Sequence, residues 1–277
     1  AGTENGEPIY YFRGDVDDNW VSFAGFYWRI IRTNSDGSIR MIYAGTDPNV
    51  TTGEGTQISL DGSTTNYQFN SNYNRSEYVG LKYTENEQHG TAIDSDIMGI
   101  LNTWYTNNLA SYASQLTSGT GFCNDRNIAS GYSWSAIPSS TIYYAAFERL
   151  FTNKMPSLDC DVTSDNFTTS GTGTGNGALT NPIGLITADE VSMAGGKNTS
   201  NYGYYLFTGL NYWTMSPYYF NASNNFAHMI AVFAGGQLTN TYVSYTTLGI
   251  RPVINLRSDV TILSGDGTSS NPYVVEA

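Results

Sequence analysis

NYWTMSPYYFNASNNFAHMIAVFAGGQLTNTYVSYTTLGIRPVINL, residues 211–256, is the stretch of this chain that says most about its fold and its function. Ten of the fifteen residues in 211–225 are Asn, Tyr, Ser or Thr, and so are eight of the nine residues in 239–247. Residues 226–238 contain none of these four types. Two polar, tyrosine-rich clusters therefore flank one apolar segment.

The apolar segment predicts a β-hairpin. Residues 226–233 read as a strand, Ala234–Gln237 as a tight turn with two glycines, and residues 238–245 as the returning strand. Pairing across this turn sets Phe226 opposite approximately Tyr245. The two polar clusters, far apart in sequence, then meet at the open end of one hairpin.

This combination of residues is typical of recognition surfaces. Tyrosine offers a large, stiff contact at low entropic cost, and Ser, Asn and Thr offer adaptable hydrogen bonds. The alternative is ordinary solvent-facing chemistry in a chain that is rich in these residues throughout. We predict a ligand-binding face within residues 211–256, made by Tyr212, Tyr218, Tyr219, Asn221, Asn224, Asn225, Asn240, Tyr242 and Tyr245.

Charge and length limit the classes of partner. The 277 residues include 24 acidic and 12 basic ones, and the net charge of -12 disfavours nucleic acids and anionic membranes as partners. Only 13% of residues are charged and 22 are tyrosines, a composition typical of extracellular proteins. No segment reaches the 18 apolar residues of a membrane span. The chain starts at Ala1, which we interpret as the result of processing or of the removal of a signal or anchor.

The two cysteines leave two alternatives open. Cys123 and Cys160 lack the short spacing of a zinc knuckle or of a redox CxxC pair. In an oxidising compartment they could form one disulfide, worth roughly 3 to 4 kcal/mol in the chain-entropy model. The other alternative is two buried thiols.

The remaining patterns predict an α+β domain that spans residues 1–277. A hairpin covers residues 21–43, around an Asp-Gly turn, and 47–83 reads as a long surface excursion. Helices are expected over 94–116, over 141–151 and, after the capping box Thr187–Glu190, over about two turns that end at Gly195. Residues 248–256 read as a buried strand, and a short strand closes the chain. The first and last strands could meet in one sheet.

Several of these segments resemble bacterial C-type-lectin-like domains. The resemblance rests on YWTMSP, GGQL and GIRPVINL in the second half, and on GFYWRIIR, FCNDR and NPIGLITADEVSMAGG before them. It implies a looped-back chain with paired N- and C-terminal strands, mixed antiparallel sheets, two main helices and long loops. The loop-rich second sheet would present the ligand contacts.

The same fold group includes the variable proteins of diversity-generating retroelements. In those proteins, adenine-directed mutagenesis diversifies surface positions near the C-terminus. Asn, Tyr, Ser and Thr can all be reached from an AAY codon by adenine substitution, and this chain concentrates them in 218–225 and 239–247. The resemblance therefore extends to a diversified binding protein.

Catalytic and metal chemistry find little support. Residues 15–19, DVDDN, begin like a calcium loop, but Trp20 and Phe26 stand where the loop needs Gly and Glu. The only histidines, His89 and His228, lie beside no recognisable nucleophile motif. Related oxygenases of this fold need a close, late pair of cysteines, which this chain lacks. We expect no catalytic residue, no metal and no cofactor.

These observations favour a noncatalytic extracellular domain on a bacterial cell surface or a phage particle. Its partner would be a protein or a glycan on another cell or particle. Three alternatives stay open: a structural subunit of a pilus or surface layer, a calcium-independent carbohydrate-binding module, and an enzyme.

Overall fold

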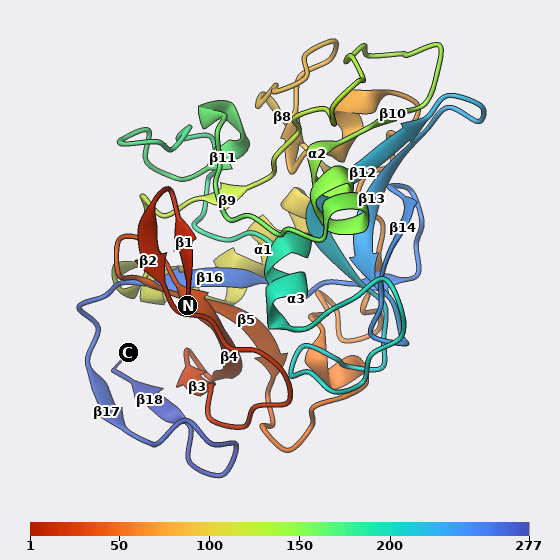
Figure 1. The fold of residues 1–277 in the computed structure, drawn as a ribbon. Coiled ribbons are helices and arrows are strands. Elements are labelled where there is room, and N and C mark those ends of the chain that lie inside the picture. Colours follow the sequence, from red (N-terminus) through yellow and green to blue (C-terminus); the bar gives the residue numbers. More distant parts are fainter. Residues whose placement is uncertain (277) are drawn as a thin grey trace.

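Both ends of the chain build the first large sheet. In the computed structural model, which describes residues 1–276, six strands lie in the order β16-β5-β4-β3-β18-β17 (Figure 1). The predicted hairpin is its centre, and β3 pairs in parallel with β18, so early and late strands meet. The strands are β3 (Trp20–Phe23), β4 (Phe26–Thr33), β5 (Ile39–Gly45), β16 (Val253–Leu256), β17 (Ile262–Ser264) and β18 (Tyr273–Val275).

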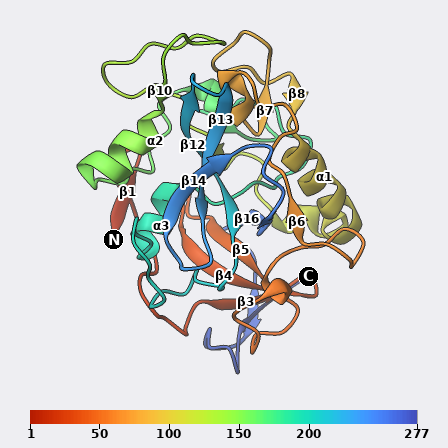
Figure 2. The same ribbon diagram turned by 90° about the vertical axis from the view of Figure 1, so that its right-hand side faces the viewer.

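The tyrosine-rich stretch builds the second large sheet. Its order is β14-β13-β12-β15-β6, and β10 joins the free side of β12. Figure 2 shows β12, β13 and β14 side by side. The strands are β6 (Asn66–Tyr67), β10 (Ile142–Tyr143), β12 (Tyr212–Asn221), β13 (Phe226–Val232), β14 (Leu238–Tyr242) and β15 (Leu248–Gly249). The predicted hairpin around Gly235 and Gly236 is confirmed.

The predicted strand over 248–256 is divided between the two large sheets. Leu248 and Gly249 form β15 of the second sheet, and Val253 begins β16 of the first. Between them lies Pro252, which has no backbone N–H to donate to a ladder. The chain therefore crosses from one sheet to the other at this point, and Arg251 beside it donates to the carbonyl oxygens of Tyr43 and Leu206.

Short elements connect the sheets. The predicted excursion over 47–83 contains only β6, the start of a small sheet and two 3-10 turns, at Glu54–Thr56 and Ser76–Val79. Three two-stranded sheets complete the structure. They are β1 (Gly2–Glu4) with β2 (Glu7–Ile9), β7 (Lys82–Tyr83) with β8 (Ile93–Asp94), and β9 (Phe122–Cys123) with β11 (Asn166–Phe167).

The first helix is shorter than its pattern predicts. Helix α1 spans Asp96–Asn108, after Ser95, and a 3-10 segment over Ala110–Gln115 replaces the expected last turns. The helix buries its apolar side chains Ile97, Leu101 and Trp104. The rings of Trp28 and Tyr43 pack edge-on against Trp104 in the core.

The prediction of a helix over 141–151 is wrong in its first part. Ile142 and Tyr143 form β10, because β-branched and aromatic side chains pack well against a neighbouring strand and β12 is available. Helix α2 is only Ala145–Phe147 and continues as a π-helical turn over Glu148–Asn153.

The third helix follows its signals. Helix α3 spans Ala188–Ala194, and both hydrogen bonds of the capping box between Thr187 and Glu190 are present. Gly195, with a φ of 123°, ends the helix.

The two large sheets share one buried core. Its members run from Val21 to Val275, with side chains from both sheets and from all three α-helices. The protein is thus an α+β structure with mixed sheets and few helices. Within residues 1–276, no helix has the length and apolar character needed to cross a membrane.

Candidate ligand-binding face

Four aromatic side chains form a row across the second sheet. Tyr143 of β10 pairs with Tyr219 of β12, Tyr219 with His228 of β13, and His228 with Tyr242 of β14. Directly paired residues point to the same side of a sheet, so the four rings share one face. The Tyr219 and His228 rings are stacked, with centroids 4.3 Å apart and planes inclined by 16°.

Further aromatic residues widen this row at its β14 end. Phe226 lies two residues before His228 on the same face, and its ring is stacked on Tyr73 at 4.6 Å. Tyr242 contacts both Phe226 and Tyr245, with centroids 5.2 Å apart in each pair. We call the combined surface the tyrosine face. Its residues are Tyr73, Tyr143, Tyr219, Phe226, His228, Asn240, Tyr242 and Tyr245.

The face is partly open to solvent. Tyr73 is 41% exposed and Tyr242 37% exposed, whereas His228 beneath them is only 8% exposed. Tyr219, Asn240 and Tyr245 are half-buried. The outer rings can therefore meet a ligand, and the inner ones hold them in place.

His228 is neutral in this setting. Its burial lowers the pKa of the imidazole to about 4, and the hydrogen bond to Oδ1 of Asn240 offsets this only in part. Nδ1 lies 3.1 Å from Oδ1 of Asn240, which leaves the amide group of Asn240 for solvent or a ligand. Nε2 of His228 has no hydrogen-bond partner within residues 1–276. A neutral ring, rather than a charged one, thus lies at the centre of the face.

The prediction that Tyr212 contacts ligand is wrong. Its side chain is fully buried, and its hydroxyl donates to the carbonyl oxygen of Leu206 at 3.0 Å. The guanidinium of Arg251 lies over its ring at 5.1 Å. Tyr212 begins the central strand β12 and belongs to the core.

Tyr218 is part of the packing under α2. Its ring contacts Phe147 at 5.1 Å and Phe151 at 5.2 Å, both edge to face. Burial raises the pKa of its hydroxyl to about 12. The half-buried Tyr218 therefore attaches the helical segment to β12, and its neighbour Tyr219 lies on the tyrosine face.

Three of the four predicted asparagines lie where β12 turns into β13. Asn224 and Asn225 are exposed, and Asn225 adopts a left-handed conformation with a φ of 55°. Oδ1 of Asn221 accepts the backbone N–H of Ser223, which stabilises the turn. These residues form the tip of the hairpin next to the face.

Four of the nine predicted contacts lie on the face itself: Tyr219, Asn240, Tyr242 and Tyr245.

Two aromatic members of the face come from segments that the sequence did not single out. Tyr73 lies in the long excursion, and the carbonyl oxygen of Tyr73 accepts the N–H of Ala227. Tyr143 lies in the segment predicted as a helix. An exposed ring, Tyr132, extends the row beyond Tyr143 at 5.4 Å. No local signal in the sequence places these residues beside β12 and β13.

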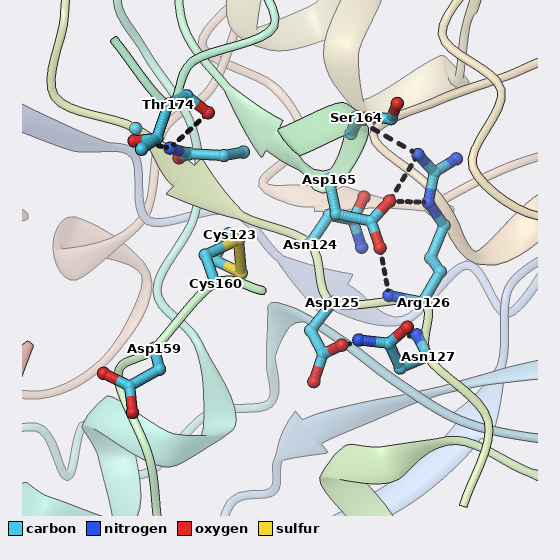
Figure 3. The surroundings of a disulfide bond; sticks show 12 residues. Cys123, Asn124, Asp125, Arg126, Asn127, Asp159, Cys160, Ser164, Asp165 and Thr174 are labelled. Carbon is cyan, nitrogen blue, oxygen red and sulfur yellow. Dashed lines mark hydrogen bonds and ion pairs between the residues drawn. A yellow bond between two sulfur atoms is a disulfide. The ribbon is translucent and has the colours of Figure 1, made fainter. Parts of the chain in front are cut away.

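The disulfide and a buried ion pair lie in a different part of the molecule. Cys123 and Cys160 are joined, with their Cα atoms 5.8 Å apart (Figure 3). Next to them, the carboxylate of Asp165 accepts from both the backbone N–H and Nε of Arg126, each at 2.7 Å. Nδ1 of His89 lies 2.9 Å from the same carboxylate. The polar cluster beside the disulfide is therefore built around Asp165.

Within residues 1–276, no group of three or more His, Cys, Asp or Glu side chains is arranged to hold a metal ion. In the acidic segment 15–19, Asp17 accepts the indole N–H of Trp20 at 3.2 Å.

The tyrosine face offers stacking surfaces and amide and hydroxyl groups, which suit noncovalent binding.

Comparison with known proteins adds no relative. A scan against protein-family models, a search of curated proteins and a search of solved structures each give no match to this chain. The resemblance to C-type-lectin-like domains therefore stays a prediction from the sequence segments quoted above.

Proposed function

We propose that the protein is a noncatalytic extracellular receptor or adhesin whose tyrosine face binds a ligand on another cell or particle. One observation carries the proposal: the row Tyr143, Tyr219, His228 and Tyr242, paired in register across four strands. Rings held on paired strands lose little conformational entropy when a ligand binds, so more of the contact energy becomes affinity.

The disulfide supports the extracellular location. Such bonds persist in oxidising compartments and are rare in the cytosol. The bond from Cys123 to Cys160 closes a loop with a sequence separation of 37. The low charge content and the abundance of Tyr, Asn, Ser and Thr point the same way.

Cell binding tests the proposal. The labelled chain is incubated with intact bacteria and with epithelial cells, and bound label is counted by flow cytometry. The double variant Tyr73→Ala/Tyr242→Ala should lose most of the binding, because both rings are exposed on the face. Tyr10→Ala should retain it, because Tyr10 is 68% exposed but lies in the N-terminal segment beside Thr33. Equal binding by the double variant and the native chain would assign the ligand to another surface.

We further propose that this face is diversified by a retroelement. Tyr219, Asn240 and Tyr242 could each arise from an AAY codon by adenine substitution, and rigid strands hold all three. Sequencing of the encoding locus in many isolates tests this. The expected result is a near-repeat of the segment for residues 211–256 beside a reverse transcriptase, with differences confined to adenines. An invariant segment without such a repeat contradicts the diversification and leaves a fixed receptor.

A further inference from the structure

Seven of the eight residues of the tyrosine face lie in two charge-free runs of the chain, and Tyr73 lies outside them. Residues 198–250 form an uninterrupted run of 53 residues without Asp, Glu, Lys or Arg, and residues 127–147 form another of 21. The rest of the chain holds all 36 charged residues. Strands β10 and β12, one from each run, pair with one another.

None of the eight residues of the face is an Asp, Glu, Lys or Arg. The charged residue nearest in sequence to a member of the face is Arg75, two residues after Tyr73. Its guanidinium is engaged by Oδ1 of Asn86 at 2.7 Å and by the buried carboxylate of Glu77 at 3.7 Å. With His228 neutral as well, the face has no charge with which to pair a charged ligand.

We infer that the ligand is a neutral glycan, bound without a metal ion; this inference rests on the proposed function. A sugar ring has an apolar side of C–H groups and a rim of hydroxyls. The exposed rings of Tyr73 and Tyr242 can pack against the C–H groups of the sugar. The amide of Asn240 and the hydroxyls of Tyr219 and Tyr245 can form hydrogen bonds with the sugar hydroxyls.

A protein partner fits this face less well. An interface of standard size buries about 800 Å² on each side, and about one residue in four of an average protein is charged. Charges buried without a partner are costly. Protein-binding surfaces are enriched in Arg as well as in aromatic residues, and this face has aromatic residues but no Arg. A calcium-bridged sugar is disfavoured too, because the runs contain no carboxylate for a hard cation.

An array of neutral, sialylated, sulfated and uronic-acid glycans, probed in EDTA at low and high salt, tests the inference. We expect binding to neutral glycans that high salt does not weaken, because uncharged contacts are not screened. In calorimetry with the best free oligosaccharide, Tyr73→Ala and Tyr242→Ala should each weaken binding at least ten-fold, and Tyr10→Ala should leave it unchanged.

The outcomes separate the two claims. Binding only to acidic glycans, loss of binding in EDTA or at high salt, or no glycan binding at all would overturn the neutral-glycan inference. If the same tyrosines are instead needed for binding to a protein on the cells described above, the proposed function stands and the glycan inference fails. If neither variant weakens any binding, both fail. Circular dichroism of each variant shows that the fold is retained.

Discussion

The tyrosine face and the cavity beside the disulfide use polar residues in opposite ways. The cavity, of about 310 Å³, is lined by Arg32, Arg40, Arg149, six carboxylates and both cysteines. The eight residues of the face include no Asp, Glu, Lys or Arg. Charged side chains thus line the one region and are absent from the other.

The charges of the cavity hold distant segments together. The carboxylate of Glu190, at the start of α3, lies 2.8 Å from Nε of Arg32 on β4 and 2.6 Å from Nε of Arg40 on β5. Arg149 joins Asp189 of α3 through two hydrogen bonds, at 3.0 and 3.1 Å. The face, by contrast, holds its rings by strand pairing and stacking. The ionic part of this protein therefore serves its architecture, and the proposed function assigns the neutral part to ligand contact.

Substitution of Glu190, which pairs with buried arginines, should have the largest effect on stability. Burial alone would raise the pKa of this carboxyl, but the guanidiniums of Arg40 and Arg32 lower it, so the group is charged. Glu190→Ala leaves the buried Arg40 without a carboxylate, leaves Arg32 with Glu4 alone and removes half of the capping box. We expect the free energy of unfolding in urea to fall by about 3 to 5 kcal/mol.

A matched variant on the surface serves as the control for Glu190→Ala. Asp259 also pairs with an arginine, Arg257, but both side chains are exposed to solvent. Asp259→Ala should leave the unfolding midpoint unchanged. Equal effects of the two substitutions would mean that the buried ion pairs do not hold the charged region together.

Removing the disulfide should have the next largest effect. The bond closes a loop with a sequence separation of 37, and its loss frees the unfolded chain. Cys123→Ser/Cys160→Ser should lower the free energy of unfolding by about 3 kcal/mol in the chain-entropy model. The native protein unfolded with a reductant should match the double variant. If reductant changes neither the stability nor the mass after alkylation, the bond is absent from the protein in solution.

Short-range patterns in the sequence predicted the scaffold of both regions. The Gly235-Gly236 turn, the capping box of Thr187 and Glu190, and the Asp-Gly turn of the first hairpin each act between residues that are close in the sequence, so the sequence displays them directly. The prediction failed where a distant partner decided the outcome. Residues 142 and 143 become a strand only because β12 lies beside them.

The binding face could be predicted only in part for the same reason. Composition identified the correct hairpin, but it could not separate Tyr212, which is buried at the start of β12, from Tyr219 seven residues later. The bulge near Pro217 shifts the register between them. Tyr73 and Tyr143 reach the face through tertiary contacts with no sequence signal.

The neutral His228 at the centre of the face should have a smaller effect, on the pH dependence of stability. The folded pKa of His228, about 4, lies below the ordinary histidine value of 6.5, so the unfolded chain binds the proton more readily. The stability from the neutral ring is present above pH 6.5 and is lost as the pH falls toward 4. Between pH 7 and pH 5 we expect a loss of about 1 to 2 kcal/mol from this group.

The variant His228→Phe isolates the contribution of His228 from that of the many carboxylates. Phenylalanine keeps the stack on Tyr219 and takes up no proton. Urea unfolding at several pH values should therefore show a shallower fall of stability below pH 6.5 for the variant than for the native protein. Parallel curves would show that His228 is protonated as readily in the folded as in the unfolded state, and that the face carries a charge in weak acid.

Substitutions at the most exposed tyrosines of the face should have the smallest effect on stability. Tyr73→Ala and Tyr242→Ala each remove a ring that is more than one-third exposed, so mainly the aromatic contacts with Phe226 are lost. We expect each substitution to lower the free energy of unfolding by about 0.5 to 1.5 kcal/mol. The reference is Tyr212→Ala, which empties a fully buried site and should cost about 3 to 5 kcal/mol. If the exposed tyrosines prove as costly as Tyr212, their rings serve the core, and the contrast between an ionic scaffold and a neutral contact face does not hold.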